Sequence, residues 1–231
     1  MKKTIALLSA LVLSSLFSVR ADILSQWTFE LSPPADLANS ATISGITADS
    51  GSGTASGVHA GALSDWTTPA GNGSANSLSV NTWAVGDYFQ FQVSTIGFTG
   101  MGISFDQTSS STGPRDFDFA YSTDGSLFTT FSPYTVLQNG LTPNPAWNAT
   151  TSSSAYAFSF DLGGVTAIDE QASVYFRLIN SSTTSAGGAT VAATGTDRVD
   201  NFTVYSPVPE PSSAALFGLG LLAWGFIRRR N

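Results

Sequence analysis

The sequence predicts an all-β protein: a single β-sandwich flanked by an N-terminal signal helix and a C-terminal hydrophobic helix. Three observations carry this prediction. Hydrophobic and polar residues alternate with period two in four stretches, which begin near residues 88, 116, 156 and 174. Turn sequences rich in Gly, Asn and Pro separate these stretches. Between residues 22 and 206, no stretch has the hydrophobic spacing of an amphipathic helix.

The alternating stretches supply the aromatic faces of the predicted sheets. In the stretch at 88–93, for example, Phe89, Phe91 and Val93 alternate with polar neighbours. Many short, half-buried strands joined by Gly- and Ser-rich turns are typical of two sheets that each bury one face. The stretches 44–62 and 181–196 are rich in Gly, Ser, Thr and Ala, and are expected to be long loops or weak edge strands. The predicted strands, in order, are 23–30, 88–93, 102–106, 116–121, 127–131, 156–162, 174–179 and 198–205.

Composition and charge exclude several classes of protein. The 231 residues include no cysteine, which excludes disulfide scaffolds and zinc-thiolate sites. Residues 22–206 contain fifteen acidic and three basic residues, a net charge of −12, and no lysine. Nucleic acid is therefore excluded as a partner, because binding phosphates needs clustered cations. An acidic domain of this kind favours divalent cations instead.

The first 21 residues are predicted to be a secretory signal. Met1-Lys2-Lys3 is followed by an apolar run over residues 5–17, and small residues precede Asp22. A basic start, a short apolar stretch and small residues before the cut are the three parts of such a signal. The alternative is a membrane anchor, but about 13 apolar residues are too few to span a bilayer comfortably. We therefore expect export through the Sec translocon and cleavage between Ala21 and Asp22.

The last 25 residues contain three features in a definite order. Val208-Pro209-Glu210-Pro211 comes first, uncharged residues 214–227 follow, and Arg228-Arg229-Arg230 comes last. As a helix, residues 212–227 would reach about 24 Å, somewhat less than the thickness of a membrane core. Three arginines resist translocation, so this end is expected to stay in the cytoplasm.

This arrangement resembles the PEP-CTERM sorting signal. The resemblance implies recognition by an exosortase, a membrane protease thought to remove the tail of exported proteins in Gram-negative bacteria. It also implies a transient stay in the inner membrane, a final place in the cell envelope or outside the cell, and a link to exopolysaccharide and biofilm. The alternative is an ordinary C-terminal anchor. The expected domains are a signal peptide at 1–21, a β-sandwich at 22–206 and a sorting signal at 207–231 with a transmembrane helix at 212–227.

Two segments in the middle resemble secreted bacterial jelly-roll domains, many of which are carbohydrate-binding-like. The first is a hairpin between Ser111 and Phe128, and the second is Asp197-Arg198-Val199-Asp200-Asn201-Phe202-Thr203-Val204. The resemblance implies a jelly-roll-like sandwich. It transfers no function, because this fold hosts many.

A structural calcium ion is the one cofactor that the sequence favours. With no cysteine and one histidine available, oxygen ligands suit a hard cation. In the jelly-roll carbohydrate-binding domains that this chain resembles, calcium often joins the first and last strands. The resemblance therefore implies Glu30, Asp36 and Asp200 as ligands, since Glu30 ends the first predicted strand and Asp200 opens the last. The alternative is that these carboxylates cap turns.

Sugar binding would require exposed aromatic rings, which stack on the apolar faces of sugars. Trp27 lies in a predicted strand and is expected in the core, and Trp83 is ambiguous. Trp66 and Trp147 lie in predicted loops and are the best platform candidates, although either could instead close over the sandwich as a lid.

Catalytic residues are not predicted. The single histidine, His59, lies in a Gly- and Ser-rich stretch without a Gly-x-Ser-x-Gly elbow, and is expected to be an ordinary loop residue. Glu30 and Glu170 lie in no recognisable glycosidase motif. The favoured function is therefore a non-enzymatic envelope or matrix protein associated with polysaccharide. The alternatives are a lectin-like carbohydrate-binding module and, third, a secreted polysaccharide hydrolase.

Overall fold

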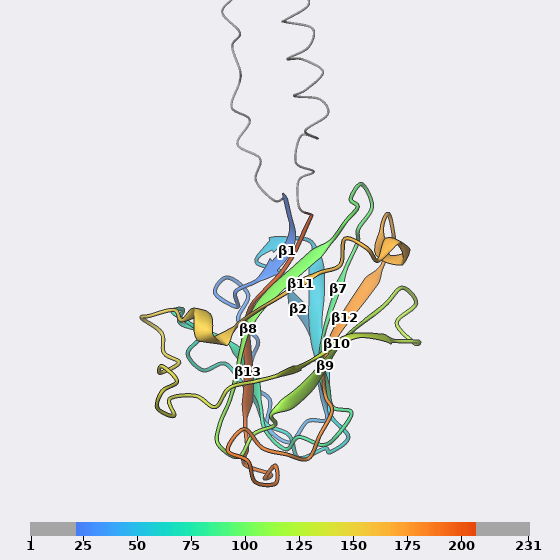
Figure 1. The fold of residues 1–231 in the computed structure, drawn as a ribbon. Helices are drawn as coiled ribbons and strands as arrows, with labels where there is room; N and C mark the ends of the chain where they lie inside the picture. Colours follow the sequence, from blue (N-terminus) through green and yellow to red (C-terminus); the bar gives the residue numbers. More distant parts are fainter. Residues whose placement is uncertain (1–21, 207–231) are drawn as a thin grey trace, which may run out of the picture. The chain divides into compact units, whose positions relative to one another are not determined.

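A computed structural model describes residues 22–206, which fold into two antiparallel sheets packed face to face (Figure 1). The prediction of a β-sandwich is confirmed. The predicted signal helix at 1–21 and membrane helix at 212–227 lie outside the described residues. Within residues 22–206, no helix has the length and hydrophobicity needed to cross a membrane.

The strands divide between the sheets without regard to their order in the sequence. The first sheet has the order β11-β8-β13-β1-β3, with β6 paired to β13 and β5 paired to β6. The second has the order β10-β9-β12-β7-β4-β2. The first sheet comprises β1 (Asp22–Trp27), β3 (Ser50–Gly51), β5 (Trp66–Thr67), β6 (Leu78–Val80), β8 (Gly102–Ser109), β11 (Ala157–Asp161) and β13 (Asp197–Ser206). The second comprises β2 (Thr42–Thr47), β4 (Gly53–Val58), β7 (Tyr88–Val93), β9 (Asp116–Ser122), β10 (Thr129–Thr135) and β12 (Val174–Asn180).

Aromatic residues from both sheets meet in the core. Because side chains alternate across a strand, β7 buries Phe89, Phe91 and Val93 and leaves its polar residues on the outer face. The ring of Phe91 lies parallel to that of Phe202 on β13, with the two centroids 3.6 Å apart. The edge of Trp27 on β1 packs against both rings, so the predicted core position of Trp27 is confirmed.

The Gly- and Ser-rich stretch 44–62 is not a loop. Its first part lies in the edge strand β2, but its second part forms β4, an inner strand between β7 and β2. Small residues are required there because large core rings from elsewhere occupy the space. A Cβ atom on Gly57 would collide with the ring of Trp66, and one on Gly53 with that of Trp27. The stretch 181–196, in contrast, contains no strand and connects β12 to β13 as predicted.

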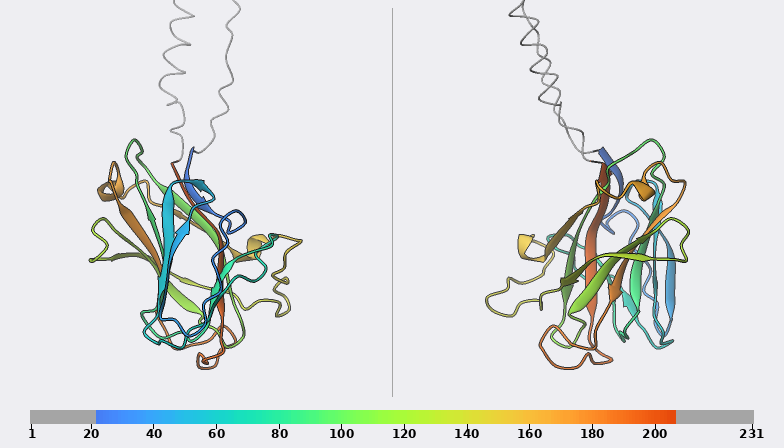
Figure 2. Two further views of the ribbon diagram at one scale, coloured as in Figure 1. Left: turned by 180° about the vertical axis from the view of Figure 1, so that it is seen from behind. Right: turned by 45° about the vertical axis from the view of Figure 1, so that its right-hand side comes forward.

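Two short 3₁₀ turns, η1 (Ser154–Tyr156) and η2 (Thr166–Ile168), are the helical segments within residues 22–206. A long excursion between β10 and β11 extends away from the sandwich and ends in η1 (Figures 1 and 2). The connection between β9 and β10 is short and belongs to the second sheet.

The first and last strands are neighbours. β1 pairs with β13 in antiparallel register, so that Asp22 lies opposite Ser206. Both described ends of the chain therefore lie at the same end of the sandwich (Figure 1).

Candidate functional site

The outer face of the second sheet carries a group of aromatic and polar side chains. Tyr88 and Gln90 point outward from β7, and Tyr175 and Arg177 point outward from β12. These strands are hydrogen-bonded neighbours, and Gln90 lies directly opposite Arg177. All four side chains are partly exposed, whereas the residues between them are buried in the core.

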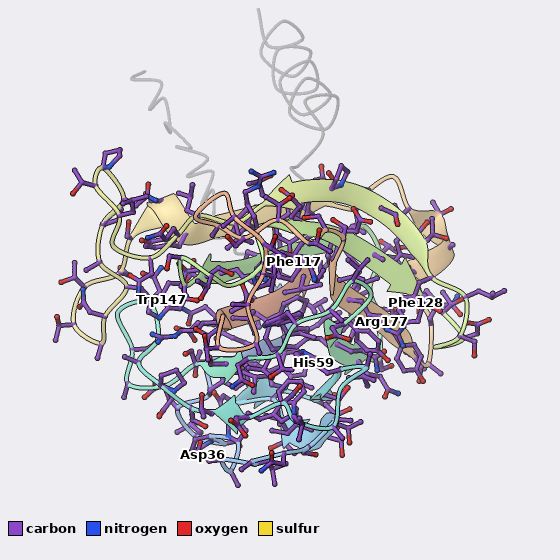
Figure 3. The ribbon with its side chains drawn as sticks, turned by 90° about the horizontal axis from the view of Figure 1, so that it is seen from below. Asp36, His59, Phe117, Phe128, Trp147 and Arg177 are labelled. Atoms are coloured by element: carbon purple, nitrogen blue, oxygen red, sulfur yellow. The ribbon has the colours of Figure 1, made fainter. Side chains whose placement is uncertain are left out.

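Arg177 is held between two aromatic rings. Its Cζ atom lies 3.7 Å from the centre of the Tyr88 ring and 3.6 Å from the centre of the Phe128 ring. Its Nε–H donates a hydrogen bond to Gln90 Oε1 at 2.8 Å. Partial burial lowers the pKa of Arg177 below its ordinary value, and the attraction of Tyr88 opposes this effect, so the guanidinium remains charged at neutral pH. Figure 3 shows Arg177 and Phe128 side by side.

Phe128 reaches this face because the β9–β10 connection folds over it. Asp124 Oδ1 accepts hydrogen bonds from the backbone N–H groups of Ser126 and Leu127, which lower the pKa of Asp124. Gly125 has a φ of 72°, and a Cβ atom there would lie 3.1 Å from the Tyr175 ring. The turn thus covers part of the sheet, and leaves Leu127 79% exposed at its tip.

Trp66 is not an exposed platform, and its prediction as a carbohydrate-binding residue is wrong. It lies in β5, its side chain is fully buried, and its Nε1–H donates to the Ser40 carbonyl at 2.9 Å. Its ring fills the space beside Gly57. Tertiary packing buries this side chain. The residues next to Trp66 in the sequence are polar, so they gave no sign of this burial.

Trp147 is also buried, at 5% exposure, as the lid alternative predicted. Its Nε1–H donates to the Ala70 carbonyl at 2.7 Å, and its ring packs edge-on against Tyr156 at 5.5 Å. It therefore fastens the β10–β11 excursion to the loop that precedes β6. Trp27 and Trp83 are buried as well, so no tryptophan within residues 22–206 offers an open ring for stacking.

His59 is buried, not an ordinary loop residue. It follows β4 and packs between Trp66 and Trp83, with ring centroids 5.0 and 4.4 Å away. Ser64 Oγ and Asp87 Oδ2 lie 2.9 and 3.5 Å from the same ring nitrogen, Nδ1. A catalytic triad needs the nucleophile and the carboxylate on opposite nitrogens. Nε2 instead faces the interior and has no hydrogen-bond partner among the described residues.

The three predicted calcium ligands do not form one group. Glu30 Oε1 accepts from the Asn76 N–H at 2.7 Å, whereas Asp36 Oδ1 accepts from the Thr68 N–H at 3.1 Å. No set of three or more His, Cys, Asp or Glu residues within 22–206 is arranged to hold a metal ion. All three carboxylates bond the connection between β5 and β6, but Asp36 reaches only its first residue, Thr68, whereas Glu30 and Asp200 bond its middle part, residues 72–76.

Asp200 is the most constrained of these carboxylates. The pairing of β13 with β8 shifts register after Asp200, an irregularity of the kind that redirects side chains. Asp200 Oδ2 accepts from the Asn72 N–H at 2.9 Å and the Ser74 hydroxyl at 2.6 Å. Burial raises the pKa of Asp200 to about 6, in spite of these hydrogen bonds.

Three oxygen atoms crowd around Gly71 in the loop beside Asp200. A Cβ atom on Gly71 would lie 2.0 Å from Ser74 Oγ, 2.2 Å from Asp200 Oδ2 and 2.3 Å from the Asn76 carbonyl oxygen. Any side chain at this position would collide with these oxygens, so glycine is required here. Carboxylate, hydroxyl and carbonyl oxygens are the types of donor that calcium takes.

Sequence reasoning missed the site on the second sheet. Its signal was present, because Tyr88, Tyr175 and Arg177 occupy outward positions of two strongly alternating strands. The contribution of Phe128 could not be seen, since the turn that brings it over the sheet lies 49 residues from Arg177 in the sequence.

Comparison with known families finds a PEP-CTERM protein-sorting motif at residues 207–230. The chain therefore carries the sorting motif that its C-terminal sequence indicated, and is an exported protein sorted by an exosortase. None of the curated proteins matches the sequence.

Several solved structures resemble the sandwich in fold. The xylan-binding domain CBM22-2 of Xyn10C from Paenibacillus barcinonensis is 14% identical, with a TM-score of 0.42 over 79% of this chain and 99% of that one. The K3 adhesin domain of Lys-gingipain from Porphyromonas gingivalis is 14% identical, with a TM-score of 0.40 over 80% and 99%. TmCBM61, solved with β-1,4-galactotriose, is 10% identical, with a TM-score of 0.33 over 78% and 94%. TM-scores and sequence identities this low say nothing about what this chain binds.

Proposed function

We propose that this protein is a non-enzymatic component of the cell envelope or extracellular matrix that binds polysaccharide through the outer face of its second sheet. The observation that carries the proposal is the stacking of Arg177 between Tyr88 and Phe128. Sugars are bound by rings that stack on their apolar faces and by fixed polar groups that bond their hydroxyls. This face combines both, with Gln90 fixed beside the guanidinium.

The charge of the domain favours an uncharged glycan. Residues 22–206 carry a net charge of −12, which repels polyanions over a distance of about 8 Å at physiological ionic strength. The guanidinium of Arg177 is stacked against the rings of Tyr88 and Phe128, so its charge is not free to bind an anionic group. Neutral polysaccharides with accessible hydroxyl groups are therefore the proposed ligands, ahead of uronic-acid polymers.

The non-enzymatic part of the proposal rests on His59. Its Nδ1 faces both Ser64 and Asp87, so the imidazole cannot pass a proton from the serine toward the carboxylate in the manner of a triad. The serine is also fully buried and closed to a polymer substrate.

Calcium belongs to the proposal as a structural ion. Asp200, Ser74 and the Asn76 carbonyl would hold it, and Glu30 would help by fixing the Asn76 backbone. When bound, the ion would supply positive charge beside a carboxylate that burial disfavours in its ionised form.

Binding by the sandwich, residues 22–206, to a panel of neutral and acidic polysaccharides tests the proposed function. Affinity electrophoresis should show retardation in neutral glycans. Arg177→Ala and Tyr88→Ala should each weaken binding by roughly 30-fold, since removing an aromatic or arginine anchor from a binding surface costs about 2 kcal/mol. Ile96→Ala, which changes an exposed side chain in the β7–β8 loop, is the matched control and should bind normally.

Either of two results would contradict the proposal. One is that the wild-type domain binds no glycan of the panel, and the other is that the Arg177 and Tyr88 variants bind as well as the Ile96 control. Release of reducing sugar by the purified domain would favour the hydrolase alternative instead.

A further inference from the structure

The sorting motif begins at the residue that directly follows the folded sandwich. β13 runs to Ser206, and the match to the motif starts at residue 207. Between the last residue of the sheet and the Pro209-Glu210-Pro211 triplet there are only two residues. A fully extended chain covers about 3.5 Å per residue, so Pro209 stands within roughly 10 Å of the last paired residue.

β13 is also firmly held up to its end. It is an inner strand, paired on one side with β1 and on the other with β8. Ile23 and Gly102 both lie opposite Tyr205, one on each side, and Asp22 lies opposite Ser206.

Side chains reinforce this end of the strand. The Tyr205 ring occupies the space that a side chain at Gly102 would need, and the Ser206 hydroxyl donates to the Thr99 carbonyl at 2.8 Å. Hydrogen bonds on both sides and two side-chain contacts thus hold the residues that immediately precede the motif.

A protease takes its substrate as an extended segment and pairs the backbone of several residues with its own. The residues before a cut near the triplet are residues 207–208 and the last residues of β13, whose hydrogen-bonding groups are already paired with β1 and β8. The protease and the sheet therefore compete for the same backbone groups.

We propose that the folded sandwich restrains removal of its own sorting tail, and that the exosortase cleaves only when the last residues of β13 have left the sheet. The inference rests on the exosortase processing described above. Local opening at a strand end is cheaper than global unfolding, so the rate of tail removal is set by the stability of this strand end.

A spacer between strand and motif tests the inference in the full chain and its native host. Six residues, Gly-Ser-Gly-Ser-Gly-Ser, are inserted between Ser206 and Pro207. Tail removal, followed by pulse-chase labelling and mass spectrometry, should become at least several-fold faster. The same six residues inserted between the exposed Gly187 and Gly188 are the control, and should leave the rate unchanged.

A second variant changes the rate in the opposite direction. Ile23→Cys with Tyr205→Cys places two thiols at directly opposed positions of β1 and β13 in a chain without other cysteines. Antiparallel partners have the Cα spacing that a disulfide needs, and exported proteins meet an oxidising compartment. The oxidised variant should lose its tail several-fold more slowly than the same variant kept reduced.

The outcomes separate the inference from the function on which it rests. Equal rates for wild type, spacer variant and control would overturn the inference while leaving exosortase sorting intact. A slower rate with the spacer would also overturn it, since it would mean that the protease uses the folded end as a docking surface. A tail that is kept both in the wild type and in the spacer variant, in a host that trims another protein with the same motif, would overturn both.

Discussion

A single buried imidazole links the stability of this protein to pH. Burial between Trp66 and Trp83 lowers the pKa of His59 to about 4, and the attraction of Asp87 only partly opposes this effect. In the unfolded chain the pKa of a histidine is about 6.5. The unfolded state therefore takes up a proton as the pH falls below 6.5, while the folded state resists protonation until about pH 4.

The free energy of unfolding should accordingly fall as the pH drops from 6.5 to 4. The two pKa values of His59 differ by about 2.5, which corresponds to a loss of roughly 3 kcal/mol in the free energy of unfolding across this window. Above pH 6.5, His59 adds no pH dependence to the stability. Urea denaturation between pH 4 and 8 measures the effect, and His59→Gln should show a flatter profile. Other groups titrate in the same range, so the difference between the two proteins is the quantity to compare; parallel profiles would mean that His59 is not held neutral.

At the scale of residues, the sequence predicted burial well only where the strand pattern decided it. Trp27 lies in an alternating strand and is buried as predicted. Trp66 and His59 sit among Ser, Gly and Asp residues that are typical of loops, yet each is covered by the other and by Trp83. Their burial results from contacts between segments that approach each other only after the sheets have formed.

The inner strand β4 has glycine at positions where a larger side chain would collide with core rings. Gly57 lies under the ring of Trp66, and the ring fills the volume that any larger residue would take. Gly57→Ala should therefore destabilise the fold by about 1–3 kcal/mol, the usual cost of adding a methyl group to a packed core.

Gly164→Ala is the matched control for this change. No heavy atom lies within 4 Å of the position that its Cβ would take, so the variant should stay within about 0.5 kcal/mol of wild type. Urea midpoints at constant slope give both values. A Gly57 variant as stable as the Gly164 variant would show that the ring does not lie where the structure places it.

At the scale of elements, alternation predicted the strands that carry large side chains. β7, β9 and β12 lie where the aromatic pattern placed them. β4 escaped prediction because its composition, which suits a loop, reflects the rings packed against it. The outward side chains of β7 and β12 were visible in the same pattern, but the turn that adds Phe128 to them was not.

Calcium should act on the whole sandwich, because its proposed site joins β13 to the loop before β6. A net charge of −12 opposes compaction, and a bound cation offsets part of it. At a hundredfold excess over Kd, the ion would add about 2.7 kcal/mol, which raises the melting temperature of a domain this size by several degrees at roughly 2–4 °C per kcal/mol.

Differential scanning calorimetry with millimolar calcium, against sodium chloride of equal ionic strength, checks this effect. Asp200→Asn should remove most of the shift, because the amide lacks the charge. Asp36→Asn should retain it, since Asp36 bonds Thr68 at the start of this loop and not the oxygens beside Asp200. If calcium and sodium give the same melting temperature, Asp200 and its neighbouring oxygens do not bind the ion.

The pairing of Asp22 with Ser206 has a practical consequence for experiments on surfaces. Residues 22–206 contain no lysine, so a domain that begins at Asp22 carries a single primary amine, its own N-terminus. Amine coupling would attach every molecule through the end where β1 begins and β13 stops. The immobilised layer would have one orientation, and the aromatic face of the second sheet would stand along the side of each molecule, open to a polymer in solution.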